Sequence, residues 1–240
     1  MIAAIKKQIR VQYENWVVCL IITMGGWIAG GILFGVVNAL LKEEAKEFIP
    51  IGTVMAAALA LLFLGIVGMT TMELYFNIEV SMGFTRKHFF VSYYMVCLLA
   101  NLFGAALVWL MGLAERWIGL RLYPDLEQAV DLPPYLLKWG APAAILLAAL
   151  SVLMGSLAMR FGKKVYWALW VVWMTVCIAG PRIAEAVEEA PDSVFGGIGR
   201  ALIRLAQAIP GDLWITGGIL LVIVGTAVSC RLLGRQQVTA

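Results

Sequence analysis

Residues 16–41 read WVVCLIITMGGWIAGGILFGVVNALL, a run of 26 residues without a charged side chain. A helix of about 20 apolar residues is long enough to cross the hydrocarbon core of a bilayer. The bilayer offers no water to backbone amides, so a spanning segment must be a helix or part of a closed barrel. The run lacks the alternation typical of outer-membrane strands, and it therefore predicts a transmembrane helix.

Five further apolar stretches follow, at about residues 50–72, 89–114, 139–159, 165–183 and 212–230. The composition agrees, because 62% of residues are hydrophobic, 14% are charged and the mean hydropathy is +0.90. These values lie outside the range of ordinary soluble domains. We predict an all-α integral membrane protein with six transmembrane helices in a single domain over residues 1–240.

The charges of the connecting segments predict the orientation. An even number of spans places both termini on one side of the membrane. If that side is cytoplasmic, it holds ten of the 18 basic residues. These residues lie close to the ends of the spans, where the positive-inside effect operates. Twelve of the 15 acidic residues then lie outside. We expect a multi-pass protein with both termini cytoplasmic. The ten inner basic residues are Lys6, Lys7, Arg10, Arg86, Lys87, Arg160, Lys163, Lys164, Arg231 and Arg235.

Two amphipathic segments accompany the spans. The first, residues 2–13, predicts a helix lying flat on the inner membrane surface, although an unstructured basic start that only sets topology remains an alternative. The second precedes the last span and predicts a short outer helix that ends at Pro210 and Gly211. The apolar faces consist of Ile2, Ile5, Ile9 and Tyr13 in the first segment, and of Ile198, Leu202, Leu205 and Ile209 in the second.

A third amphipathic segment, FNIEVSMGFTRKHFF at residues 76–90, lies between the second and third spans. Its apolar residues recur at spacings near one helical turn, and its charged residues supply a basic end. A protein that only had to stay inserted would need no such segment. We interpret it as a docking surface for a partner.

The order of residues in this segment resembles the cytoplasmic loop between spans two and three of bacterial ABC type-2 export permeases. In that family the loop carries a coupling helix that sits in a groove of a separate ATPase subunit. The resemblance also covers the topology, from the inner-surface helix through six spans to the outer helix before span six. The ATPase-coupling residues that it implies are Glu79, Ser81, Met82, Gly83, Phe84, Thr85, Arg86 and Lys87.

The resemblance implies a permease in a bacterial cell membrane that pairs with a second copy or a paralogue and with two copies of the ATPase. ATP and magnesium would bind to that ATPase, so no cofactor is expected in this chain. No nucleic-acid partner is expected either. The sequence itself contains no Gly-x-x-x-x-Gly-Lys-Ser/Thr loop, and no cytoplasmic stretch is long enough for a nucleotide-binding domain.

Glycines and tryptophans supply the other candidate residues. Gly26 with Gly30, and Gly31 with Gly35, form two small-residue faces on the first span, which could pack within the chain or between subunits. In the fifth span, Trp170 and Trp173 could line a path for an amphipathic or hydrophobic substrate. The simpler interpretation places them in an aromatic belt and the helix core.

Other function classes are less well supported. No span carries an ionisable residue near its middle, which disfavours an ion-coupled carrier. Asn38, Asn77 and Asn101 supply no nucleophile with a base, and His88 is the single histidine, so an intramembrane lipid-modifying enzyme is a weak alternative. A non-transporting partner, such as an immunity or sensor subunit, is another. We predict a transporter permease rather than an enzyme.

Overall fold

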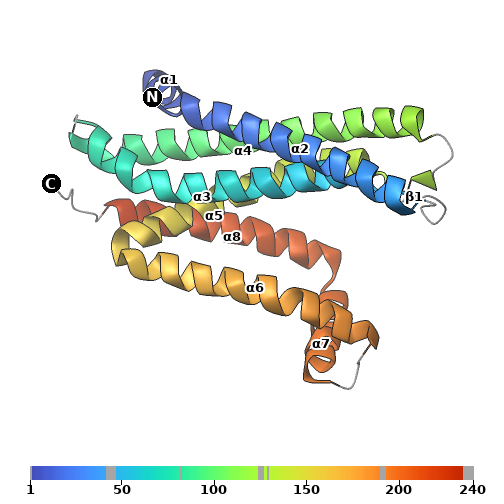
Figure 1. Ribbon diagram of the computed structural model, residues 1–240. Helices are drawn as coiled ribbons and strands as arrows, with labels where there is room; N and C mark the ends of the chain where they lie inside the picture. Colours follow the sequence, from blue (N-terminus) through green and yellow to red (C-terminus); the bar gives the residue numbers. More distant parts are fainter. Residues whose placement is uncertain are drawn as a thin grey trace.

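The computed structural model describes residues 2–41, 47–81, 83–123, 127–128, 130–189 and 193–234. Nearly all of these residues are helical (Figure 1). The elements in chain order are α1 (Ile2–Val11), α2 (Tyr13–Leu41), β1 (Glu47–Phe48), α3 (Ile51–Ser81), α4 (Arg86–Leu122), β2 (Glu127–Gln128), α5 (Leu132–Phe161), α6 (Lys163–Glu189), α7 (Val194–Ala208) and α8 (Gly211–Gly234).

Five helices, α2, α3, α4, α5 and α8, are long and apolar enough to cross a membrane. They cover five of the six predicted spans, so the prediction of an all-helical chain with several helices suited to crossing a membrane is confirmed. The predicted fifth span, residues 165–183, lies within the continuous helix α6, which does not belong to that set. The amphipathic segments before the first and last predicted spans form separate helices, α1 and α7.

The helices extend beyond the predicted spans. A charged residue ends the charge-free run that defines a predicted span, but it does not end the helix. Glu73 lies on an exposed position of α3, and Arg116 lies on an exposed position of α4. The region from Glu115 to Leu122, predicted as the start of an outer loop, is therefore helical. Helix α4 ends where the Tyr123 N–H donates to the Gly119 carbonyl at 2.9 Å.

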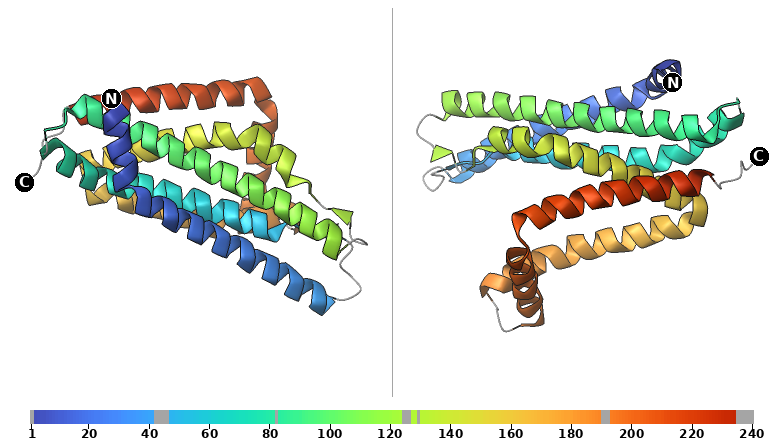
Figure 2. Two further views of the ribbon diagram at one scale, coloured as in Figure 1. Left: turned by 90° about the horizontal axis from the view of Figure 1, so that it is seen from above. Right: turned by 180° about the vertical axis from the view of Figure 1, so that it is seen from behind.

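Helices α2 to α5 lie side by side, and α8 packs along α5 (Figures 1 and 2). The start of α1 and the end of α8 lie at one end of this bundle, together with the α3–α4 turn and the α5–α6 turn; we call it the terminal end. The β1–β2 pair and α7 lie at the opposite end (Figure 2). Helix α1 packs mainly on α4, whereas α6 packs mainly on α7 and more lightly on α5.

The interior is built from small residues, and most of the large aliphatic side chains face outward. Buried positions on α3 and α5 include Ala56, Ala60, Ala148 and Ala149, while α8 buries only Gly225, Ser229 and Leu233 among its residues. Small residues allow close helix packing, which holds bundles together where lipid removes the hydrophobic drive. The exposed aliphatic surface suits a lipid environment.

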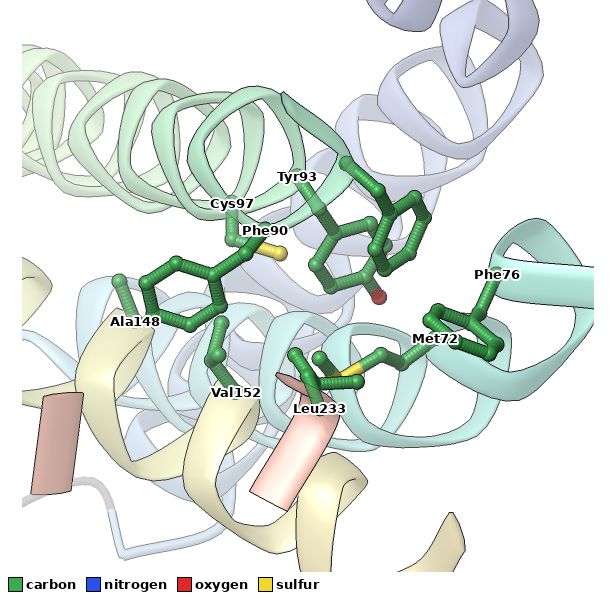
Figure 3. Packing of buried hydrophobic residues seen from close by; sticks show 9 residues of the cluster. Met72, Phe76, Phe90, Tyr93, Cys97, Ala148, Val152 and Leu233 are labelled. Atoms are coloured by element: carbon green, nitrogen blue, oxygen red, sulfur yellow. The ribbon is translucent and has the colours of Figure 1, made fainter. Parts of the chain in front are cut away.

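The larger buried side chains form one cluster toward the terminal end of the bundle (Figure 3). Met72 and Phe76 of α3 meet aromatic residues of α4, with Phe76 and Phe89 in an edge-to-face contact at 5.3 Å between ring centroids. Leu233 of α8 and Val152 of α5 complete the cluster. Helices α3, α4 and α5 and the end of α8 are therefore fixed at this point.

At the opposite end, a buried carboxylate caps α3. Glu115 of α4 accepts hydrogen bonds from the Gly52 N–H at 3.0 Å, the Thr53 N–H at 2.6 Å and the Thr53 hydroxyl. The first N–H groups of a helix have no partner within the helix, and a negative charge there is also favoured by the helix dipole. Glu115 thus joins the start of α3 to α4 inside the protein.

Aromatic rings close the same end of the bundle. Phe34 of α2 meets Phe48 of β1 at 4.8 Å and Tyr123 at 5.5 Å between ring centroids. Phe48 also packs on Gly119, where an added Cβ would lie 2.8 Å from the ring. The two-residue parallel β1–β2 pair, which no sequence signal predicted, places Phe48 in this position.

The two glycine faces of α2 have different surroundings. A Cβ at Gly30 would lie 2.6 Å from the Gly52 Cα, and one at Gly26 would lie 2.4 Å from the Leu59 side chain. A Cβ at Gly31 would meet nothing within 4 Å, and one at Gly35 would meet only the Tyr123 hydroxyl at 3.8 Å. Gly26 and Gly30 therefore pack within the chain, against α3.

Candidate docking site at the α3–α4 turn

A tight turn joins α3 to α4 at the place where the sequence predicts a docking surface. The Gly83 N–H donates to the Val80 carbonyl at 3.1 Å, and the Phe84 N–H donates to the Glu79 carbonyl at 3.0 Å. Gly83 has a φ of +88°, which favours glycine. This pair of bonds around a left-handed glycine is a common way to end a helix. Met82 lies outside the described residues.

Thr85 begins the next helix. Its side chain accepts a hydrogen bond from the His88 N–H at 3.3 Å, which satisfies one of the free donors of the first turn of α4. Residues 76–81 are the last turns of α3, and residues 86–90 are the first turns of α4. A separate coupling helix after the second span is therefore not confirmed. The amphipathic spacing belongs to two helices that Gly83 separates.

Helix α1 covers one side of this turn. The Lys7 Nζ lies 5.4 Å from the centroid of the Phe84 ring, within cation–π range. Glu79 is only 6% exposed, and Lys7 is the cationic group that acts on its carboxylate. Phe84 itself is half-buried. The turn and α1 therefore form one composite surface.

The remaining predicted coupling residues have two kinds of environment. Ser81, Thr85 and Lys87 are exposed, so they can contact a partner or lipid headgroups. Arg86 is partly buried, and its Nη1 donates to the Gly234 carbonyl at 3.0 Å. This bond attaches the end of α8 to the start of α4. Gly83 shapes the turn, and the exposed cations around it give the surface a positive charge.

The predicted substrate-path residues lie on a different element. Trp170 is exposed on α6 and contacts Trp167 edge-to-face at 5.8 Å between ring centroids. It borders an open groove of about 310 Å³ with apolar walls along α6. The side chain of Trp173 lies outside the described residues. A substrate path along α6 stays a prediction.

The burial of three polar side chains was not predicted from the sequence. Gln8 and Gln12 at the α1–α2 junction and Asn101 of α4 are each at most 5% exposed. Gln8 and Gln12 are one helical turn apart, so they share a face of the segment. That spacing was a usable signal, because it puts two amides on the side opposite Lys6 and Arg10.

Among the described residues, no group of three histidine, cysteine, aspartate or glutamate side chains could hold a metal ion. Comparisons with protein-family models, with curated proteins and with solved structures found no match for this chain. The family resemblance therefore rests on residues 79–90 and on the order of the helices.

Proposed function

We propose that this chain is the membrane-spanning permease subunit of an ATP-driven exporter of the ABC type-2 kind. The observation that carries the proposal is the composite surface at the terminal end. There a half-buried Phe84 is held against Lys7 of α1, and the exposed Lys87 follows three positions later. An apolar anchor within a polar rim is a common arrangement at protein interfaces.

The turn is suited to passing on a movement. Helices α3 and α4 contain 31 and 37 residues and run to within a few residues of Phe84 without an intervening loop. A displacement of the turn by a partner therefore acts directly on two long helices. In the proposed exporter, the partner is an ATPase subunit in two copies that binds ATP and magnesium. This chain and a second permease copy or paralogue would form a cavity between them. Closure of the two ATPase subunits would switch that cavity between inward-open and outward-open states.

The course of the chain supports a sixth crossing. Helices α5 and α8 pack against each other and run in the same direction, from the β1–β2 end to the terminal end (Figures 1 and 2). If both cross the membrane, the chain between them must cross back. Helix α6 makes this return, and its 27 residues are about 40 Å long at the usual rise per residue. We therefore include α6 as the fifth of six spans.

A bacterial cell membrane with both termini cytoplasmic completes the proposal, and labelling tests the orientation. In a chain without native cysteines, Val130→Cys and Lys164→Cys place thiols on exposed positions at opposite ends of the bundle. An impermeant thiol reagent should label position 130 in intact cells and position 164 only after the cells are opened. Reversed labelling would show that the orientation is wrong.

Phe84→Asp tests the function. Desolvating a new carboxylate at the centre of a docked interface should cost about 2–4 kcal/mol, equal to a roughly 30- to 1,000-fold loss of affinity. We expect the variant to insert and fold but to lose co-purification of an ATPase and ATP-driven transport. Amphipathic or hydrophobic compounds are the substrates to assay first, because the exposed groove on α6 is apolar.

Lys87→Ala is the matched control. Lys87 is exposed in the same turn, and a rim charge contributes little to affinity, so binding should fall less than about fivefold. An ATPase that binds the wild-type chain without any transport would favour a non-transporting immunity or sensor subunit. Full transport by Phe84→Asp, or a wild-type chain without a bound ATPase, would contradict the proposal.

A further inference from the structure

Unpartnered polar groups are concentrated beneath the α1–α2 junction. Within the described residues, nine buried side-chain nitrogen and oxygen atoms lack a hydrogen-bond partner, and seven belong to this junction or to the α3 and α4 residues that face it. Buried polar groups are rarely left unpaired in folded proteins, so such a concentration needs an explanation. The seven are Gln8 Oε1 and Nε2, Gln12 Nε2, Asn15 Nδ2, Trp16 Nε1, Glu79 Oε2 and Asn101 Oδ1.

A small cavity lies among four of the residues that carry these atoms. Gln12, Asn15, Trp16 and Asn101 line it together with Cys97 and with small and apolar residues of α3 and α4. Gln12 and Asn101 are 5% and 4% exposed, so both are more than nine-tenths buried. The cavity volume is about 20 Å³, which is sufficient for one water molecule and too small for a larger ligand.

The chemistry of the lining selects the occupant. No charged residue lines the cavity, and its lining residues include two unpaired N–H donors, on Gln12 and Trp16, and one unpaired oxygen acceptor, on Asn101; the Asn15 amide also interacts with the Tyr75 hydroxyl. A cation would need several oxygen ligands, and an anion would have no cationic partner in the lining. A water molecule both donates and accepts, so it can accept from the Gln12 amide and donate to Asn101 Oδ1, while Asn101 Nδ2 donates to the Cys97 carbonyl at 2.8 Å.

We propose that this cavity is a hydration site, in which one ordered water joins the α1–α2 junction to Asn101 of α4. The edge of Trp16 supplies a donor to the same water, while its ring is held against Phe103 at 5.5 Å between centroids. Buried water that bonds otherwise unpaired groups is part of a folded structure. Cys97 lines the cavity, so the proposal places its buried thiol next to this water.

Thiol hydrogen exchange measures this contact. Two chains that each retain one cysteine, Cys97 or Cys19, are compared after transfer to heavy water by following the infrared S–H band. Both thiols are buried, but Cys19 lies against Thr23 and does not line the cavity. We expect the Cys97 thiol to exchange at least about tenfold faster than that of Cys19, because a resident water supplies deuterium.

Asn101→Leu removes the acceptor and fills the cavity, so it should slow exchange at Cys97 to the rate of Cys19. Asn38→Leu, a similar change outside the cavity lining, should leave the rate unchanged. If Asn101→Leu fails to fold, Gln12→Leu replaces it and should slow exchange in the same way. Equal exchange rates for Cys97 and Cys19 in the otherwise unchanged chain would overturn the proposal.

Discussion

Gly30→Leu is expected to prevent α2 from packing on α3. The Cβ of any residue at position 30 would lie 2.6 Å from the Gly52 Cα, 2.8 Å from its nitrogen and 2.9 Å from the Ile51 carbonyl oxygen. All three atoms belong to the backbone, so no side chain can rotate away and the helices must move apart. Overpacking of a fixed interior typically costs about 1–3 kcal/mol, and a leucine between two backbones should exceed that range.

The neighbouring glycine provides the control. Gly31→Leu adds the same side chain one residue later, where a Cβ meets nothing within 4 Å. In detergent, Gly30→Leu should melt many degrees below the wild type, whereas Gly31→Leu should keep its melting temperature. The milder pair, Gly30→Ala and Gly31→Ala, separates the contact from helix propensity, because alanine is favoured over glycine by about 1 kcal/mol at both positions. Equal melting temperatures for the two alanine variants would refute the close contact.

Glu115→Ala is expected to give the second largest loss of stability. The change leaves the Gly52 N–H, the Thr53 N–H and the Thr53 hydroxyl without their acceptor inside the protein. Hydrogen bonds to charged groups contribute about 1.5–3 kcal/mol each, and the three are not independent because one carboxylate makes them all. We expect the free energy of unfolding to fall by about 3 kcal/mol or more. Denaturant unfolding in detergent measures it.

Two further variants identify the cause. Glu115→Gln keeps one acceptor oxygen in place, so it should recover part of the loss. Asp131→Ala removes another carboxylate at the same end of the bundle. Its partner is Arg116 at 3.3 Å, and the two side chains are 40% and 45% exposed. An exposed pair contributes at most about 1 kcal/mol, so this control should remain close to the wild type. A Glu115→Ala variant as stable as Asp131→Ala would show that the cap does not hold α3.

The sequence predicts the helices well because each is specified by its own residues. Absence of charge over about 20 positions indicates a span wherever it occurs, and the periodicity of residues 2–13 indicates α1 without knowledge of the rest. The ends are less predictable. Glu73 and Glu79 interrupt the apolar run after residue 72, but the helix continues to Ser81 and ends because of Gly83.

The candidate site was predicted in part. Phe84 and its neighbours do lie in one tight turn, but the sequence does not indicate that Lys7, more than 70 positions earlier, contacts the Phe84 ring. The sequence also does not indicate that Glu115 accepts hydrogen bonds from Gly52 and Thr53, which lie 63 and 62 positions earlier. Charge indicated an outer loop for Glu115, because an isolated carboxylate is costly to bury. Only the tertiary structure shows the donors that offset this cost.

The light attachment of α6 to the bundle has a thermodynamic consequence. Helices α2 to α5 and α8 share extensive contacts, while α6 and α7 pack chiefly on each other. Regions with fewer tertiary contacts open at lower free energy and do so as cooperative units. The α6–α7 pair should therefore separate from the bundle at a lower free energy than the other helices, because the α5–α8 contact already holds the helices on both sides of the pair. We expect two cooperative units of unequal stability in detergent, and the losses of stability expected for the Gly30 and Glu115 variants refer to the unit of α2 to α5 and α8.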